Sequence, residues 1–394
     1  MKNAVTLLEA AEINPPLPKG RVPLLGDQVA FVPMAQVGED GSITSVESRL
    51  FSEVSKGYTQ FYENDVLLAK ITPCMENGKA AMVNGLSSLV GCGSTEYHVL
   101  RAREGTWPRY LFHSVWNEPF RKLAARNMTG SAGQKRVPRS FLESHKIPLP
   151  SLAEQKRIAA ILDKADAIRR KLQQSLRLYD DFLRSTFLDM FGDPVTNPKG
   201  WPIATIRDLL TETAYGTSKK ASESEGKFPC LRMNNITYSG GWDFKSLKYV
   251  DLDKHEQSKN LVHAGQLLFN RTNSKELVGK TAVYRRKEPM AFAGYLVRGI
   301  ANEENDTEYI SAFLNLPHGK AILQGMCKNI IGMANINAEE FKSIRIAKPP
   351  LKLQRQFAKI VISTEQKKES LLNFLKEAET LFSSLQQQAF RGEL

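Results

Sequence analysis

Apolar residues in two long stretches of the chain recur every three or four positions, a spacing that is typical of amphipathic helices. The first stretch follows Pro150 and the second follows Pro350. A capping box, Ser151-x-x-Glu154, opens the first stretch, and Gly192 ends it. We expect the following side chains to pack the two helices together: Ile158, Ile161, Ile168, Leu172, Tyr179, Phe357, Ile360, Leu371, Leu375 and Phe382.

Each predicted helix has about 37 residues, so at about 1.5 Å per residue it is about 55 Å long. A helix of this length extends well beyond the surface that one small domain can cover. Two helices of matching length can bury their apolar stripes against each other, and we expect them to form an antiparallel coiled coil. The alternative is that each helix folds back on its own domain.

The chain repeats itself with a period of about 200 residues, which is far above the periods of solenoid proteins. Val66–Lys70 aligns with Leu267–Arg271 at an offset of 201, and Pro150–Gln155 aligns with Pro349–Gln354 at an offset of 199. Because these matches occur in the same order, the chain reads as two copies of one unit. The copies are residues 1–193 and residues 194–394.

Each copy begins with a segment rich in glycine, proline and asparagine, with short strand-like runs such as Ala80–Val83 and Thr281–Tyr284. Such runs between turn residues indicate a mixed α/β (α+β) domain with a small twisted sheet. We therefore predict globular domains at residues 1–150 and 193–350, related by a pseudo-twofold repeat. The long helices occupy residues 151–192 and 351–394.

The formal charge of the chain is +12 and its isoelectric point is about 9.4. This excess suggests a polyanionic partner, although basic proteins of membrane surfaces have similar values. The sequence has neither a run of 18 apolar residues nor a secretory signal at its start, and none of its four cysteines forms a CxxC pair. We expect a cytoplasmic protein that does not insert into membranes.

Two segments resemble nucleotide or methyltransferase motifs but depart from them. Asn14-Pro15-Pro16-Leu17 is similar to the Asn-Pro-Pro-aromatic loop of amino-group methyltransferases, but Leu17 cannot stack on a flipped base. Gly279-Lys280-Thr281 would end a P-loop, but Ser274 replaces its first glycine and a strand-like run follows. We therefore expect neither segment to bind a nucleotide.

Carboxylates near a lysine could indicate a metal-dependent nuclease, and Asp65, Glu76 and Lys79 have these residue types. Gln266 stands opposite Asp65 in the second copy, and the six histidines are scattered along the chain. No catalytic constellation and no metal site is predicted.

Polar and basic residues gather in turn-rich loops at corresponding places of the two copies. Arginine and lysine can contact guanine edges or phosphates, and asparagine and glutamine can pair with adenine. The alternative is a set of solvated loops with local turns. We expect these residues to contact DNA: Lys70, Thr72, Asn77, Lys79, Gln134, Lys135, Arg136 and Arg139 in the first copy, and Arg271, Asn273, Lys280, Lys328, Asn329 and Asn335 in the second.

Several strings resemble the specificity subunits of type I restriction–modification systems. PLPSLAEQKRIAAILDKADAIRRK, from Pro148 to Lys171, is similar to their first conserved region, and KPPLKLQRQFAKI with the terminal QQQAFRGEL resembles the second. LLFNRTNSKELVGKTAVY and LLAKITPCMENGKAAMV resemble strings of their target-recognition domains. The resemblance covers essentially the whole chain.

The resemblance implies a non-catalytic subunit that reads a split, asymmetric sequence in double-stranded DNA, one half per recognition domain. It implies two modification subunits and ATP-driven restriction subunits as partners. S-adenosylmethionine, ATP and magnesium are then expected on those partners, and no cofactor on this chain. Two alternatives stay open: a coiled-coil scaffold that joins two protein-binding domains, and a lone DNA methyltransferase or nuclease.

Overall fold

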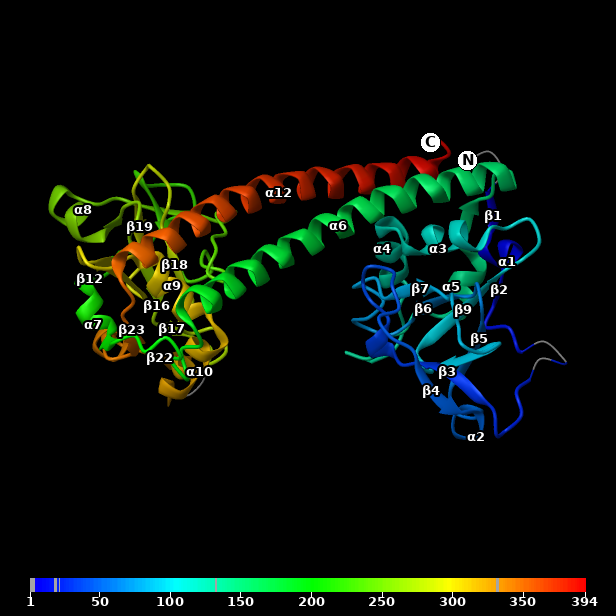
Figure 1. Cartoon of the computed structure of the whole chain (residues 1–394). Helices are drawn as coiled ribbons and strands as arrows, with labels where there is room; N and C mark the ends of the chain where they lie inside the picture. The colour runs from blue at the N-terminus through cyan, green and yellow to red at the C-terminus, as the bar shows by residue number, and fades with distance from the viewer. Residues whose placement is uncertain (1–3, 18–19, 21, 132, 331–332) are drawn as a thin grey trace. The chain divides into compact units, whose positions relative to one another are not determined.

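The computed structural model describes residues 4–17, 20, 22–131, 133–330 and 333–394 (Figure 1). The chain divides into two compact units. Unit 1 consists of Met1–Gln173 together with Asn373–Leu394, and unit 2 consists of Gln174–Leu372. Each unit therefore contains one globular part and one stretch of each long helix.

The two long helices are α6 (Leu152–Phe191) and α12 (Leu351–Arg391), which confirms the prediction from the apolar stripes. The Ser151 hydroxyl accepts a hydrogen bond from the Glu154 amide at 3.3 Å, as a capping residue does. Gly192 follows α6 with a φ of 83°, a left-handed conformation that glycine adopts without strain and that ends the helix.

The globular part of unit 1 contains two four-stranded sheets with the orders β2-β9-β6-β7 and β4-β3-β8-β5. All their neighbouring strands are antiparallel except β3 and β8, which are parallel. A separate pair, β1 and β10, joins the start of the unit to the segment before α6. The bounds are β1 (Ala4–Thr6), β2 (Ala11–Ile13), β3 (Gln28–Val32), β4 (Glu47–Leu50), β5 (Thr59–Tyr62), β6 (Val66–Ala69), β7 (Ala80–Met82), β8 (Val90–Gly93), β9 (Tyr97–Ala102) and β10 (Lys146–Pro148).

Unit 2 repeats this topology with the orders β12-β20-β16-β18 and β14-β13-β19-β15, and β11 pairs with β23. A further sheet, β17-β22-β21, lies in the loop region. The bounds are β11 (Ile203–Thr205), β12 (Leu210–Tyr215), β13 (Phe228–Leu231), β14 (Lys248–Val250), β15 (Leu261–Val262), β16 (Leu267–Asn270), β17 (Thr272–Asn273), β18 (Thr281–Val283), β19 (Met290–Phe292), β20 (Leu296–Ala301), β21 (Lys328–Ile330), β22 (Met333–Asn335) and β23 (Arg345–Ala347).

Short helices complete each globular part, and they too occur in corresponding order. In unit 1 they are α1 (Leu7–Ala10), the 3-10 turn η1 (Met34–Gln36), α2 (Phe51–Val54), α3 (Pro108–Trp116), α4 (Glu118–Arg126) and α5 (Arg139–Ser144). In unit 2 they are α7 (Ile206–Leu209), α8 (Lys254–Asn260), α9 (Thr307–Asn315), α10 (Pro317–Met326) and α11 (Ala338–Lys342). The predicted repeat of a mixed α/β domain is therefore present in the fold.

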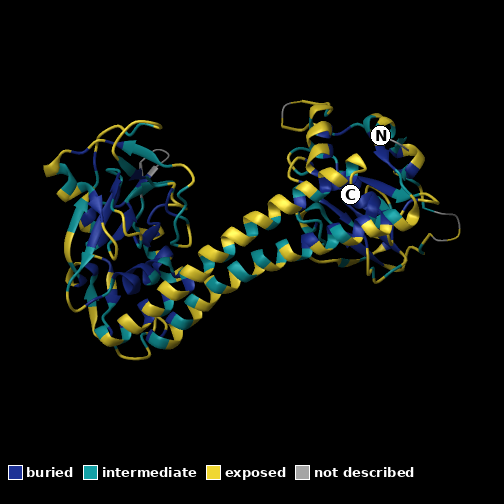
Figure 2. Cartoon of the chain, turned by 90° about the horizontal axis from the view of Figure 1, so that it is seen from above, coloured by how far each residue is buried: buried dark blue, intermediate teal, exposed yellow. Residues whose placement is uncertain are grey.

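Within each unit, the stretches of α6 and α12 run in opposite directions and close the core. In unit 1, Ile158 near the start of α6 shares a core with Phe382 and Ala389 near the end of α12. In unit 2, Phe187 near the end of α6 lies 5.6 Å from Phe357 near the start of α12. Buried and exposed positions alternate along both helices (Figure 2).

Most of the other predicted packing residues are half-buried, and they are Ile161, Leu172, Tyr179, Ile360, Leu371 and Leu375. The structure differs at Ile168, which is 55% exposed. The next residue, Arg169, points toward the Phe382 ring, with its guanidinium 4.9 Å from the ring centre. Because neighbouring residues on a helix diverge by about 100°, Ile168 faces away from that contact.

Two buried glutamines connect the starts of the long helices to the globular parts. Gln155 accepts a hydrogen bond from the Trp107 amide at 2.8 Å, and Gln354 accepts one from the Asp306 amide at 2.9 Å. Each also donates to a backbone carbonyl before its own helix, in Pro150 and Pro349 respectively, at 2.8 Å. These bonds fix where each helix leaves its domain. The two glutamines occupy matching places in the repeated string, at an offset of 199.

Candidate nucleic-acid interface

In unit 1, the two loops that carry predicted DNA contacts lie side by side. The Thr72 amide donates to the Lys135 carbonyl at 3.0 Å, and the Val137 amide donates to the Lys70 carbonyl at 2.8 Å. The first loop follows β6 and the second follows α4. Residues that are far apart in the sequence therefore form one continuous edge of the unit.

Unit 2 brings its corresponding loops together in the same way. The Ile336 amide donates to the Arg271 carbonyl at 2.9 Å, the counterpart of the bond between Val137 and Lys70. Strand β17 then pairs with β22, which places Thr272 opposite Asn335. The predicted contact residues of each unit thus gather at one place, although the sequence alone did not indicate this pairing.

Three predicted residues of unit 1 expose polar side chains on this edge. Gln134 and Lys135 are exposed, and within the described part of the chain no other residue forms a hydrogen bond or ion pair with their side chains. Asn77 is also exposed, and its amide donates to the Glu39 carboxylate at 2.9 Å. Gln134 and Lys135 can therefore reach a ligand without breaking an internal contact.

Two predicted arginines of unit 1 are held by carboxylates instead. Arg136 forms a bidentate pair with Glu96, at 2.7 Å and 2.9 Å, and this hydrogen bonding keeps the pKa of Glu96 below its usual range. Arg139 lies 2.8 Å from Glu143, one helical turn further along α5. A DNA phosphate would have to compete with these carboxylates for either guanidinium.

Two of the predicted loop lysines, Lys79 and Lys280, form hydrogen bonds inside the fold. Lys79 donates to the Met34 carbonyl at 3.1 Å, and Lys280 donates to the Met233 carbonyl at 2.6 Å. Lys280 is 7% exposed, and burial lowers its pKa. The structure differs here from the expected phosphate contact, since the ammonium of Lys280 is directed at a backbone carbonyl and has little access to solvent.

Arg271 is the centre of the corresponding loop region in unit 2. Its Nε donates to Asn335 Oδ1 at 3.2 Å, and its guanidinium lies 5.0 Å from the ring centre of Tyr215, which is 45% exposed. The Asn273 side chain accepts a hydrogen bond from the next backbone amide at 2.9 Å. Strand β21 contains the Lys328-Asn329 pair, whose side chains lie outside the described part of the structure.

A cleft of about 340 Å³ lies beside Arg271 in unit 2, and we call it the basic cleft. The Arg271 amide donates to the carbonyl of Tyr295, which lines the cleft, at 3.1 Å. No carboxylate is among the lining residues, whereas four of them carry positive charge: Lys219, Lys220, Arg232 and Lys248. These four come from three separate segments, since Lys219 and Lys220 are adjacent, so their convergence could not be read from the sequence.

The four cations of the basic cleft differ in how they are paired. Lys219 lies 2.6 Å from Glu256, and Lys248 lies 3.3 Å from Glu223. The Arg232 guanidinium donates to a backbone carbonyl at 3.0 Å, and its buried Nε has no hydrogen-bond partner among the described residues. Among the described residues no carboxylate pairs with Arg232, so the positive charge that it brings to the cleft is not neutralised there.

The motifs that resembled enzyme sites have structural roles. Asp65 is 1% exposed and pairs with Arg101 at 2.7 Å. Asn14 accepts a hydrogen bond from the Val99 amide at 2.9 Å and so joins the N-terminal segment to β9.

Among the described residues, no three His, Cys, Asp or Glu side chains are grouped to hold a metal ion. No described helix is both long and apolar enough to cross a membrane.

Comparison with protein families gives matches in both halves of the chain. The family model described as the type I restriction modification DNA specificity domain matches residues 28–178 and 198–378. The specificity subunit of the type I restriction enzyme EcoAI of Escherichia coli is 41% identical over 181 residues, or 44% of this chain and 30% of that subunit. The EcoKI specificity subunit of Escherichia coli K12 is 24% identical over 355 residues, or 82% of this chain and 76% of that subunit.

Solved structures are similar over nearly the whole length of the chain. The specificity subunit of a type I restriction-modification system from M. genitalium has a TM-score of 0.57 at 14% identity, covering 98% of this chain and 96% of that one. A structure concerned with complex assembly and conformational transition of the type I system has a TM-score of 0.54 at 18% identity, covering 100% and 98%. These likenesses show a shared fold.

Proposed function

This chain belongs to the family of specificity subunits of type I restriction–modification systems, because the family model covers both of its halves, and we propose that it is the DNA-reading subunit of such a complex. The observation that carries the proposal is the pairing of the predicted loops in each unit, through Val137 and Lys70 in unit 1 and through Ile336 and Arg271 in unit 2. Each unit reads one half of a split sequence, and the bases between the halves are not read directly.

The proposed contacts differ between the two units. In unit 1, Gln134 is suited to a base edge and Lys135 to a phosphate, because both side chains are exposed. In unit 2, Asn273 is suited to a base edge, and Arg271 with the cations of the basic cleft is suited to the DNA backbone. A net charge of +12 favours such an association over a purely protein-binding scaffold.

The proposed complex supplies the chemistry that this chain lacks. Two modification subunits would use S-adenosylmethionine to methylate adenine, and restriction subunits would use ATP and magnesium for cleavage. We propose no cofactor on this chain, which itself catalyses nothing, and we expect the complex to act in the cytoplasm. Residues 1–150 and 193–350 would be its target-recognition domains, and residues 151–192 and 351–394 its helical spacer.

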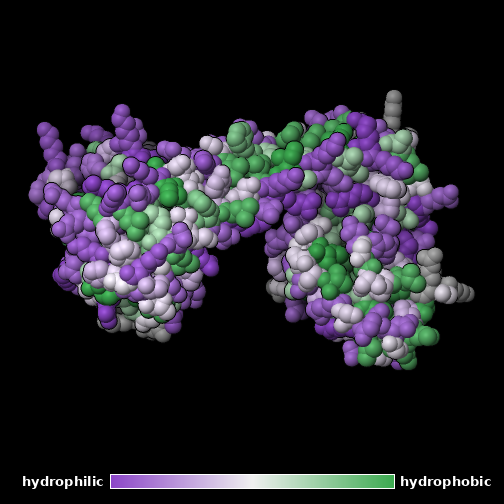
Figure 3. Space-filling view, in the orientation of Figure 1, coloured by the Kyte–Doolittle hydropathy of each residue, from purple (hydrophilic) through white to green (hydrophobic). Residues whose placement is uncertain are grey.

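Exposed apolar side chains on the long helices support docking of partner subunits. In unit 1, Phe374 and Leu381 of α12 are 59% and 55% exposed, and in unit 2, Leu178 and Phe182 of α6 are 58% and 50% exposed. Hydrophobic residues are visible along the surface of these helices (Figure 3). Large exposed apolar side chains in such number are typical of a surface that another protein covers.

The proposed function is tested by DNA binding of the chain together with its modification subunits over a series of salt concentrations. We expect binding of one split sequence to exceed binding of random DNA by at least about a thousandfold. Substitution Arg232→Ala should weaken binding to all sequences and reduce the salt slope by about one for one lost phosphate contact. Lys199→Ala, an exposed lysine of unit 2 outside the basic cleft, is the matched control. Equal affinity of the wild-type complex for random and selected DNA would contradict the proposal.

A further inference from the structure

His98 of β9 is a buried residue that contacts the paired loops of unit 1 from inside the fold, and it is 4% exposed. Its Nε2 lies 2.8 Å from the Val137 carbonyl. The Val137 amide in turn donates to the Lys70 carbonyl at 2.8 Å, and Val137 closely follows the loop that carries Gln134 and Lys135. The histidine therefore holds the segment that joins the two loops with proposed DNA contacts.

The other ring nitrogen of His98 faces the side chain of Asn14. Because Asn14 Oδ1 accepts a hydrogen bond from the Val99 amide, the atom that faces His98 is the amide nitrogen, 3.1 Å from Nδ1. An amide nitrogen only donates, so Nδ1 has to accept. Nε2 then carries the ring proton and donates it to the Val137 carbonyl. One neutral tautomer of the ring satisfies both hydrogen bonds.

A protonated ring does not fit this arrangement. Both nitrogens of an imidazolium donate, so the Nδ1–H would be directed at the N–H groups of Asn14. Turning the Asn14 amide over would present its oxygen to the ring, but the Val99 amide would then lose its acceptor. Protonation of His98 therefore breaks one of the two connections.

Three charged side chains around the ring act on its protonation. Burial is the largest influence and lowers the pKa of His98, while the Val137 hydrogen bond opposes this shift. Lys70, which follows β6, and Arg139 of α5 also disfavour the charged ring, whereas Glu96, just before β9, favours it. Because burial and the two cations prevail over Glu96, the ring is neutral at pH 7.

Unit 2 fixes the corresponding segment without a histidine. Val297 of β20 stands at the place of His98, at an offset of 199, and is buried. Tyr215 lies opposite Val297 in the sheet, and its hydroxyl accepts a hydrogen bond from the Ala338 amide at 3.0 Å. Ala338 lies two residues after Ile336, whose amide bonds the other loop. Of the two connecting side chains, the histidine is the one that gains a charge in mild acid.

We propose that His98 is a positioning residue for DNA reading by unit 1, and that its neutral Nε2–H tautomer holds the two contact loops at the spacing that this half of the site requires. The ring is buried and touches no DNA itself. Asn14 has the role of selecting the tautomer. This inference rests on the proposed function as a DNA-reading subunit.

The first test measures how strongly the complete complex discriminates against DNA in which one of the two specified segments is scrambled. His98→Leu removes both hydrogen bonds and should reduce discrimination at one segment at least about tenfold, with the other segment read as in wild type. Tyr215→Phe is the matched variant of unit 2 and should affect the opposite segment. His98→Gln offers one donor and one acceptor and should restore most of the discrimination that His98→Leu loses.

The substitutions can also contradict the proposal. If His98→Leu changes neither segment or both equally, or if His98→Gln fails as completely as His98→Leu, the hydrogen bonds of His98 do not position the loops. If His98→Leu does not fold, His98→Gln and the pH dependence of the wild-type complex decide the question.

The second test follows discrimination at each segment from pH 7.5 to pH 5.0. In wild type we expect discrimination at the segment read by unit 1 to fall at least about fivefold, because protonation disrupts the loop pairing, while the other segment changes little. His98→Gln should give a flat profile. His145→Gln is the control and should follow wild type, because His145 is a second histidine of unit 1 whose pKa is lowered by burial, and its ring packs on Phe120 and Phe141.

A flat wild-type profile, or an equal fall in His98→Gln, would overturn the role of the tautomer. If the wild-type complex discriminates at neither segment at pH 7.5, the proposed function itself fails. If it discriminates at both and no substitution of His98 changes this, the proposed function stands and the role of His98 is wrong.

Discussion

Equivalent positions in the two units carry different charges, although the strands around them follow the same order. Where unit 1 joins Glu96 to Arg136, unit 2 has Tyr295 and Asn335. In unit 1 the Glu96 carboxylate offsets the charge of Arg136, whose side chain is still 42% exposed. In unit 2 no carboxylate takes that place, and the basic cleft opens beside it. The same framework therefore supports two loop regions with different recognition chemistry.

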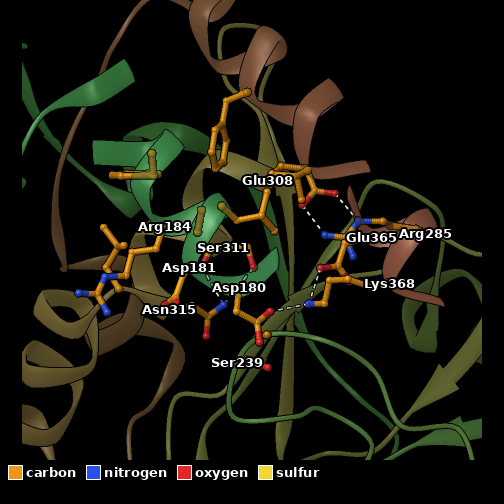
Figure 4. A pocket seen from close by; sticks show the side chains of 17 residues that line it. Asp180, Asp181, Arg184, Ser239, Arg285, Glu308, Ser311, Asn315, Glu365 and Lys368 are labelled. Carbon is orange, nitrogen blue, oxygen red and sulfur yellow. Dashed lines mark hydrogen bonds and ion pairs between the residues drawn. The ribbon is translucent and has the colours of Figure 1, made fainter. Parts of the chain in front are cut away.

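The units also differ in how completely their interiors are filled. In unit 1, Trp116 and neighbouring rings fill the space between α3 and the long helices. In unit 2, the corresponding space is an open pocket of about 210 Å³, and Ser311 and Asn315 are among its lining residues (Figure 4). Unit 2 also buries Lys320, at 7% exposure, with no hydrogen-bond partner for its ammonium among the described residues. Arg121 stands at the equivalent place in unit 1. The two units therefore share their strand pairing but differ in the side chains that fill the space between the strands and the helices.

Separating the two halves should have the largest effect, because unit 1 takes part of its core from the end of α12. A fragment of residues 1–193 lacks Phe382 and Ala389, which belong to that core. At an offset of 199, Leu183 and Met190 of a second fragment could replace them. We expect sedimentation to show a twofold dimer at micromolar concentration. A stable folded monomer would show that unit 1 does not need the second helix.

Replacing one residue of unit 1 by its counterpart in unit 2 should have the next largest effect on stability. Trp116→Asn gives unit 1 the residue of unit 2 and also removes the hydrogen bond from the indole to the Gly78 carbonyl, at 3.0 Å. We expect a loss of about 3–5 kcal/mol in the free energy of unfolding, measured by denaturant titration. Trp107→Asn is the control, because Trp107 is 39% exposed and should cost far less. Similar losses for both would mean that the aromatic cluster does not stabilise unit 1.

Removing the buried charge of Lys320 should change the free energy of unfolding less than Trp116→Asn does. The change should also have the opposite sign, because the protein should become more stable. Burial, together with the nearby Lys280, lowers the pKa of Lys320 from 10.5 to about 8. The unfolded chain therefore binds this proton more tightly, so stability is reduced below pH 8 and recovers as the pH rises toward 10.5. Lys320→Met should raise the stability of unit 2 at pH 7 by up to about 3 kcal/mol and flatten that pH dependence.

The control for this prediction is Lys135→Met, since Lys135 is exposed in unit 1. It should leave the free energy of unfolding at pH 7 nearly unchanged, because it removes a charge that is not buried. If Lys320→Met is no more stable than wild type at pH 7, burial of that ammonium carries no net cost.

The sequence predicted the elements whose signal is local. The apolar stripe and its capping and terminating residues gave α6 to within one residue at each end of 151–192, because helical periodicity needs no knowledge of the rest of the fold. The matching strings revealed the repeat, and the runs at Ala80–Val83 and Thr281–Tyr284 became β7 and β18. Ile168 departed from expectation because a wide stripe does not define which edge meets the partner helix.

The candidate site was less accessible to prediction, because its properties depend on contacts between distant segments. Arg136 was predicted to contact DNA from its loop alone, and the sequence did not indicate that Glu96 would pair with it. Lys280 looked exposed in a turn-rich loop, but its side chain reaches the Met233 carbonyl. The basic cleft combines residues such as Lys219 and Lys248 that have no common motif. The matching glutamines at 155 and 354 were visible as letters, but their buried hydrogen bonds were not.

The central claim is that the two units read separate halves of one DNA site, and sequencing of DNA selected from a random pool tests it most directly. The wild-type complex should select two specified segments with unspecified bases between them. Gln134→Ala should relax one segment and Asn273→Ala the other, each by about 1–3 kcal/mol per lost base contact. Selection of a single continuous sequence, or relaxation of both segments by either substitution, would contradict the account.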